Sequence, residues 1–263
     1  MKAYLAILYA RMATLFQYRG AAFAGIATQV FWAIIKTMIL TAFYAQASVS
    51  QPISLTQAIT FIWLGQALLA LLPWNIDKEL EAQVKNGNVS YELVRPINLY
   101  SLWYARAFAI RTVPTIMRCI PVFMIAILFF GLSAPVSWLA SLTFGISLIL
   151  GAFLSAAITT LIIISLFWTI SGEGIQRLMP HVALLLSGLI VPLPLFPEWL
   201  QPFLNVQPLR GVIDIPSRLY TGLIPIQEAF YYLGFQLLWI LILVGIGKWL
   251  MSRGLRQIVI QGG

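Results

Sequence analysis

Few residues of this chain have types that could do chemistry, and they do not form a catalytic constellation. His181 is the only histidine and Cys119 the only cysteine, so a disulfide within the chain and a cysteine metal cluster are excluded. A lone histidine in a helix is more often a hydrogen-bonded structural residue than a site. The only Gly-Lys pair, Gly247-Lys248, lacks the spaced glycine and the Ser/Thr of a phosphate-binding loop. We therefore expect no catalytic residue, no metal site and no ATP hydrolysis by this chain.

Four charged residues need an explanation. Asp77 and Glu81 lie one helical turn apart, as metal ligands can, but no second acidic motif or histidine is near, and a solvated helix face is the commoner meaning of such a pair. Lys36 falls within an apolar stretch, where it either snorkels to the outer interface or faces a cavity and meets an anionic substrate group or a partner chain. Arg118 raises the same question nearer the cytoplasm. Both alternatives stay open, and both cations are candidates for a pathway or an interface.

The composition indicates the solvent that surrounds the elements carrying these residues. The 263 residues are 60% hydrophobic and 9% charged, with a mean hydropathy of +0.90. A soluble domain would carry about a quarter charged residues, so the solvent of most of this chain is a bilayer. A net charge of +8 would suggest nucleic acid in a soluble chain, but here the basic residues lie between apolar stretches, as the positive-inside rule produces. We expect lipid as a partner and no nucleic acid.

Six stretches are apolar over about the 20 residues that a helix needs to cross the hydrocarbon. The fifth is marginal, because prolines interrupt it. Basic residues gather before the first stretch, between the second and third, and after the fourth and sixth, which places both termini in the cytoplasm. The prediction is an all-α integral membrane protein in which residues 1–263 form one transmembrane domain. The stretches are about 20–44, 55–74, 112–132, 138–168, 178–196 and 227–250.

Three segments outside these stretches have predicted structures of their own. Residues 1–18 form an interfacial elbow helix with a modest apolar arc. Residues 192–226 are rich in proline but also apolar, which favours short re-entrant helices in the outer leaflet. In residues 76–104, apolar residues recur every fourth position from Ile76, which predicts a cytoplasmic amphipathic helix that ends at the Asn86-Gly87 turn. An aromatic cluster then leads back to the membrane.

The stretch DKELEAQVKNGNVSYELVRPINLYSLWYARAF resembles the first cytoplasmic region of bacterial type-2 ATP-binding-cassette (ABC) permeases, in the subgroup of six-span exporters of drugs and toxic compounds. The shared pattern is an acidic helix, a turn of the form G-x-[small/apolar]-S-x-x-L-x-RP and an aromatic entry to the third span. The stretch SGLIVPLPLFPEWLQPFLNVQPLR is similar to the outer re-entrant region of these permeases. With the elbow helix and the basic last helix, the resemblance covers essentially the whole chain.

The resemblance implies a permease subunit that pairs as a homodimer or heterodimer and forms half of an export pathway for hydrophobic or amphipathic compounds in a bacterial inner membrane. ATP and Mg²⁺ would bind a separate cytoplasmic ATPase subunit, and this chain would carry no cofactor. Residues 76–104 would be the coupling segment that transmits the closure of the ATPases to the spans. No substrate-binding residue can be carried over. The coupling candidates that match the pattern are Asp77, Glu79, Glu81, Gly87, Arg95 and Pro96.

Two other classes of protein remain as alternatives. A secondary transporter or channel would need paired broken helices with intramembrane acids, yet Glu228 is the only acid near a predicted span. An integral-membrane enzyme would need a second acidic or histidine cluster, which the sequence lacks.

Overall fold

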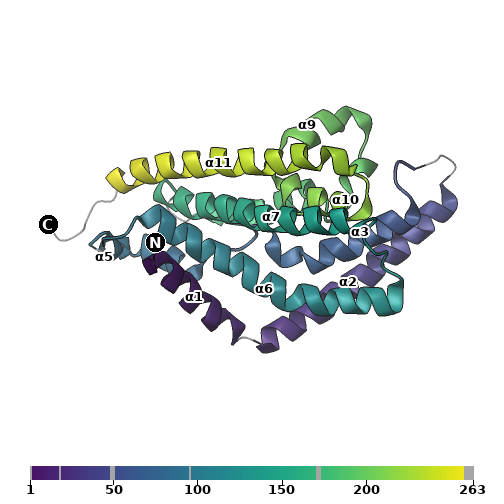
Figure 1. The fold of residues 1–263 in the computed structure, drawn as a ribbon. Coiled ribbons are helices and arrows are strands. Elements are labelled where there is room, and N and C mark those ends of the chain that lie inside the picture. The colour runs from purple at the N-terminus through teal and green to yellow at the C-terminus, as the bar shows by residue number, and fades with distance from the viewer. Residues whose placement is uncertain (1, 18, 48–50, 95, 170–172, 258–263) are drawn as a thin grey trace.

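The computed structural model describes residues 2–17, 19–47, 51–94, 96–169 and 173–257, and throughout these ranges it contains helices and no β-strand. Four long helices run side by side, with α7 between α6 and α11 (Figure 1). Their bounds are Arg19–Gln46 for α2, Leu99–Phe130 for α6, Trp138–Ile164 for α7 and Ala229–Gly254 for α11.

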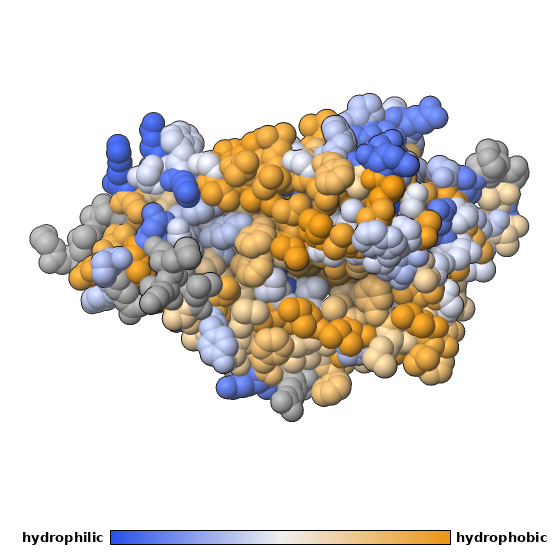
Figure 2. Space-filling model, in the orientation of Figure 1, coloured by the Kyte–Doolittle hydropathy of each residue, from blue (hydrophilic) through white to orange (hydrophobic). Residues whose placement is uncertain are grey.

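Within the described ranges, four helical stretches are long and apolar enough to cross a membrane, and they agree in position with the first, third, fourth and sixth predicted spans. Apolar side chains form a band over the middle of the long helices, and hydrophilic side chains gather mainly toward the two ends (Figure 2). The remaining predicted spans overlap shorter helices, the fifth only in its first half, so a total of six spans stays a prediction. The short helices are α3, Leu55–Ala67, extended by the 3₁₀ turn η1, Leu69–Leu71, and α8, Glu173–Leu186.

The helix α7 is the centre of the bundle. Protein buries 67% of its most apolar window, against 11% for the window in α2. Small residues on α7, such as Ala152 and Ala157, let α6, α10 and α11 approach it closely. The outer helices therefore keep broad apolar faces for lipid or for another chain.

The helix α6 begins earlier than the predicted span 112–132. Asn98 caps it by accepting a hydrogen bond from the backbone N–H of Ser101 at 3.0 Å, and the helix then continues through Arg106 and Arg111. The charge count that predicts the orientation takes these two arginines as cations of the connection between the second and third apolar stretches. The structure corrects that boundary, because both guanidinium groups have partners inside the protein.

The segment 192–226 folds into short helices, as its prolines predicted. Two of them are α-helices, α9 at Gln201–Val206 and α10 at Asp214–Thr221, and α10 packs against α7 and α3. The chain turns at Gly188 and Gly222, whose φ angles of +85° and +74° favour glycine. The 3₁₀ turns are η3 at Leu193–Leu195, η4 at Glu198–Leu200, η5 at Pro208–Gly211 and η6 at Ile226–Glu228.

Three further helices lie near the start of α6 (Figure 1). The predicted elbow helix is α1, Lys2–Phe16, and it packs beside α6. The helices α4, Lys78–Lys85, and α5, Val89–Leu93, follow one another at the same end of the bundle. Leu80 of α4 is fully buried against the first turns of α6, so the helix that the spacing of apolar residues predicted has an inward face.

Candidate functional site

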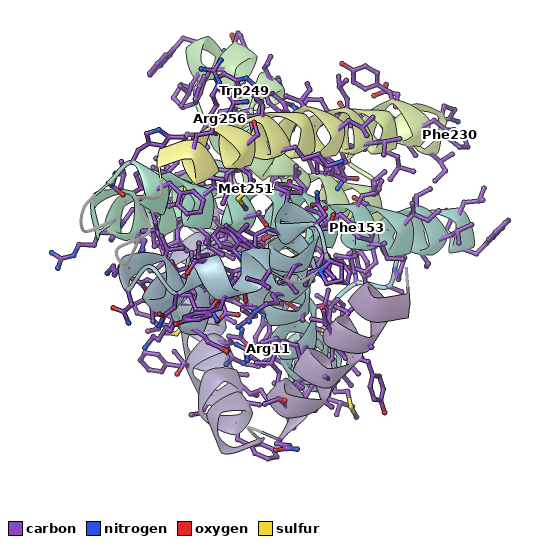
Figure 3. All side chains as sticks on the ribbon, turned by 90° about the vertical axis from the view of Figure 1, so that its left-hand side faces the viewer. Arg11, Phe153, Phe230, Trp249, Met251 and Arg256 are labelled. Atoms are coloured by element: carbon purple, nitrogen blue, oxygen red, sulfur yellow. The ribbon has the colours of Figure 1, made fainter. Side chains whose placement is uncertain are left out.

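Asp77 lies at the centre of a cluster of ion pairs that joins three helices. Its side chain is 1% exposed and caps α4 by accepting the N–H of Glu79 at 3.0 Å. Arg11 of α1 donates to both of its carboxylate oxygens, at 3.0 and 3.1 Å, and Arg106 of α6 donates to one at 2.8 Å. Glu79 accepts from the same arginines, at 2.6 Å from Arg106 and 3.4 Å from Arg11. In Figure 3, Arg11 lies between α1 and the rest of the bundle.

This cluster corrects the prediction that Asp77 and Glu81 both lie on a solvated helix face. Asp77 does not lie on a solvated helix face, because its carboxylate is buried and two arginines neutralise it. Glu81 does face outward in part, and it pairs with Lys85 at 2.8 Å. The hydrogen bond from Lys85 lowers the pKa of Glu81 below its ordinary value. Over the described ranges, no group of three His, Cys, Asp or Glu residues could hold a metal ion.

The turn between α4 and α5 has the geometry that Asn86-Gly87 predicted. Gly87 adopts a φ of +71°, which lets the chain reverse directly after α4. Within α5, Glu92 points inward and accepts a hydrogen bond from the indole N–H of Trp103 at 3.2 Å. Two apolar side chains, Tyr91 and Val94, point outward instead and are 74% and 85% exposed. The exposed face of α5 is therefore apolar, whereas Lys78, Glu79 and Lys85 are exposed on α4.

We name the exposed apolar residues Tyr91, Leu93 and Val94 the α5 tip. Pro96, just beyond it, is also exposed, whereas Arg95 lies outside the described residues. The coupling candidates that the resemblance implies do not include these three side chains, and the role of those candidates stays a prediction. The sequence feature that indicates an exposed apolar face is the presence of Tyr91, Leu93 and Val94 in a segment too short and polar to span a membrane.

Arg111 connects this region to the centre of the bundle. Its guanidinium is fully buried and donates to the carbonyl of Leu72 and to the side-chain oxygen of Asn75, both at 2.7 Å. It also donates to the backbone carbonyl of Asn75 and, at 3.1 Å, to the hydroxyl of Thr159 on α7. Arg111 therefore holds together α6, α7 and the chain that leads from η1 to Asp77.

Lys36 points into the protein rather than toward an interface. Its ammonium donates to the carbonyl of Leu189 at 2.8 Å, directly after the positive-φ turn at Gly188. Neither snorkelling nor contact with an anion describes this bond. Lys36 satisfies a backbone acceptor where the chain is not helical, and such irregular backbone at membrane depth needs a partner. Its part in a pathway stays a prediction.

Replacement of Lys36 by methionine is expected to loosen the turn after α8, because the carbonyl of Leu189 loses its donor. Amide hydrogen exchange in a peptide covering 187–196 should become faster by about fivefold, as the loss of one hydrogen bond of about 1 kcal/mol implies. Lys248→Met is the control, since Lys248 is exposed near the end of α11. Unchanged exchange in the Lys36 variant would contradict this role.

Arg118 lies in the contact between α2 and α6. Its guanidinium carbon is only 2.6 Å from the position that a Cβ on Gly25 would occupy, so α2 accepts this side chain because residue 25 is glycine. In the described part of the chain, its Nε makes no hydrogen bond. Arg118 is thus a charge between helices of one chain, and any role in a pathway stays a prediction.

The single histidine and the single cysteine have local partners. The Nδ1 atom of His181 lies 3.0 Å from the carbonyl of Arg177, one helical turn earlier. Cys119 is a free thiol whose sulfur lies 3.6 Å from the carbonyl of Ile116. Both contacts are internal to one helix, as expected of structural residues.

These features define an all-helical, membrane-embedded protein whose buried charges connect a short helical unit to the bundle. Residues 30–262 match the model of the family described as ABC-2 family transporter protein, so the chain belongs to that family. It is a permease of the ABC transporter class, a component of transport rather than an enzyme. A search among curated proteins finds no match to the chain.

Proposed function

We propose that the chain is the permease subunit of an ATP-driven exporter and that α4 and α5 couple it to a separate ATPase subunit, which binds ATP and Mg²⁺. The observation that carries this proposal is the orientation of the unit. Its buried acid, Asp77, turns inward to Arg11 and Arg106, and the α5 tip is exposed at the end of the bundle, beyond the apolar band (Figures 1 and 2).

The α5 tip has the properties of a contact surface for a protein. An exposed aromatic residue next to two aliphatic ones is costly in water, and aromatic anchors within a polar rim are typical of protein interfaces. We include in the proposed contact, as the rim of the tip, the exposed Gly87 and Pro96 and the half-exposed carboxylate of Glu79. The proposed contact is therefore made by the tip and its rim, with Asp77 as a positioning residue behind them.

Two buried links support transmission of movement from the tip to the spans. The ion pairs of Asp77 join α4 to α1 and α6, and Arg111 joins the preceding chain to α6 and α7. Groups that are buried and hydrogen-bonded move together, because separation would leave polar groups unsatisfied. Closure of an ATPase against the tip would thereby displace α1, α6 and α7 as connected elements.

The rest of the proposal concerns topology and substrate. We place the α5 end in the cytoplasm of a bacterium, with both termini there and six spans in the inner membrane. The exposed apolar faces of α2, α6 and α11 leave room for a second permease, identical or different, that completes the pathway. Hydrophobic or amphipathic compounds are the proposed substrates. Lys36 and Arg118 lie inside the chain, which makes them positioning residues of its helices in this proposal.

Tyr91→Ala and Val94→Asp are expected to weaken binding of the ATPase subunit by about thirtyfold each, the effect of losing an interface anchor of about 2 kcal/mol. We expect an ATPase with Walker A and signature motifs to be encoded next to this permease, and that ATPase is the probe. Binding is measured by co-purification, and coupling by stimulation of ATP hydrolysis. Trp199→Ala is the matched control, because Trp199 is 78% exposed on η4, at the other end of the bundle.

Unchanged ATPase binding in both tip variants would reject the assignment of the α5 tip. Transport by the purified chain that needs only an ion gradient, with no ATPase present, would reject the exporter proposal itself and favour a secondary transporter.

A further inference from the structure

A cavity of about 810 Å³ lies at the end of the bundle opposite α5, between the short helices around α9 and the start of α11 (Figure 1). Its volume is within the usual range for small-molecule sites. Two arginines line it, Arg210 from η5 and Arg218 from α10, and Glu198 of η4 lines it as well. The cavity shares no residue with the α4–α5 unit, and nothing in the proposed function uses it.

The arginines share a single buried carboxylate. Asp214 is 0% exposed, and its Oδ2 lies 3.5 Å from Arg210 and 3.6 Å from Arg218. Both distances are longer than a good charge-assisted hydrogen bond, and among the described residues neither carboxylate oxygen accepts one. Asp214 alone therefore does not balance these two guanidinium groups, and the exposed Glu198 is the other acid beside the cavity. The Arg218 side chain is 19% exposed, so part of its positive charge can be reached from the cavity.

Arg210 is held in place as a wall of the cavity. Its Nη1 donates to the backbone and side-chain oxygens of Asn205 at 2.9 and 2.7 Å, and its side chain is 4% exposed. Its guanidinium carbon lies 5.5 Å from the ring centre of Tyr232 and 5.7 Å from that of Phe235. Within the described chain, its Nε and Nη2 make no hydrogen bond. A buried cation with unused donors and an aromatic wall indicates a site for an anion that also has an apolar part.

We propose that this cavity binds the anionic group of an amphipathic molecule, a phosphate or a carboxylate. Arg218 contacts the anion, Arg210 supplies positive potential behind it, and Tyr231 and Phe235 contact the apolar part. The anion supplies the hydrogen-bond acceptor that Asp214 does not give to either guanidinium group. Two sources share this chemistry, the headgroup of an anionic lipid and a free phosphate. They differ in whether the aromatic wall contributes to binding, because only the lipid has an apolar part.

The full chain, purified in a neutral detergent, is titrated with dioctanoyl phosphatidylglycerol, with dioctanoylglycerol and with inorganic phosphate, and binding is measured by native mass spectrometry. We expect phosphatidylglycerol to bind and dioctanoylglycerol, which has the same chains without the anion, not to bind. Arg218→Gln should weaken binding about tenfold, the effect of losing one charged hydrogen bond. Lys248→Gln, which also removes one positive charge but near the far end of α11, should leave it unchanged.

A second variant keeps the test valid if Arg218→Gln folds poorly. Glu198 is exposed and lines the cavity, so Glu198→Gln removes a repulsive charge and should tighten phosphatidylglycerol binding a few-fold. Inorganic phosphate that binds as tightly, with the same response to both variants, would support the anion site and identify a soluble anion as its ligand. Equal binding of dioctanoylglycerol, or binding that neither variant changes, would overturn the proposal.

Discussion

Asp77→Asn is expected to lower the free energy of unfolding by about 3 kcal/mol, more than any other single replacement of an acid on α4. Asparagine caps a helix as well as aspartate does, so the cap of α4 is retained and only the charge is lost. Arg106 would then stay 11% exposed with only Glu79 and its surroundings to balance it. Leaving Arg11 and Arg106 with only the half-exposed carboxylate of Glu79 is the physical reason for the large effect.

A double-mutant cycle with Arg106→Gln measures the pair directly. The combined variant should be more stable than the sum of the single effects predicts, by about 1–3 kcal/mol, because removal of both charges leaves no unpaired ion. Stability is followed as the thermal midpoint of the full chain in detergent. Glu81→Gln is the matched control, since its pair with Lys85 lies nearer the surface and contributes well under 1 kcal/mol.

The same variants show whether Asp77 acts by positioning the α5 tip or by contacting the ATPase itself. If Asp77 positions the α5 tip, Asp77→Asn should reduce stimulation of the ATPase, and Arg106→Gln should do the same although it changes no residue of the tip. Equal stability of the Asp77 and Glu81 variants would show that the buried ion pairs do not hold α4 in place.

The sequence predicted the long helices and the turn after α4, because these depend on local properties. Apolar length defines a span, and Asn86-Gly87 defines a turn, whatever the rest of the chain does. The direction in which α4 and α5 face depends on partners that are distant in sequence. Arg11 and Asp77 are 66 residues apart, and nothing in either neighbourhood indicates that they meet.

The arginines of α6 show why a charge count misleads. The positive-inside rule counts Arg106 and Arg111 by side of the membrane, which treats every cation as equivalent. In the structure, both are held inside the bundle by carboxylate, carbonyl and hydroxyl groups. The orientation that the rule predicts does not depend on this difference, but the start of α6 does.

The sequence contains a charge pattern that indicates the arginines of the cavity, and the prediction of short helices did not use it. Arg210, Asp214 and Arg218 follow one another at intervals of four residues, which on a continuous helix brings the carboxylate between the two cations. The prolines of 192–226 argue against a continuous helix, and therefore against a continuous helical face. The structure keeps the spacing from Asp214 to Arg218 on α10 and supplies Arg210 from η5.

Arg111→Met tests the link between the chain that leads to α4 and the centre of the bundle. Methionine fills much of the same volume but donates no hydrogen bond, so the carbonyls of Leu72 and Asn75 and the hydroxyl of Thr159 lose a buried donor. We expect a loss of about 3 kcal/mol in stability, the cost of several unsatisfied acceptors after partial relaxation.

The functional readout of Arg111→Met differs from that of the α5 tip. Because Tyr91 and Val94 are untouched, the ATPase subunit should still co-purify, while its stimulation by the permease falls about tenfold or more. Arg111→Lys should rescue little of this, since one ammonium cannot reach acceptors on α7 and on the chain after η1 together. Arg177→Met, near the start of α8, is the control for loss of an arginine. Normal stimulation in the Arg111 variant would show that movement reaches the spans through the ion pairs of Asp77 alone.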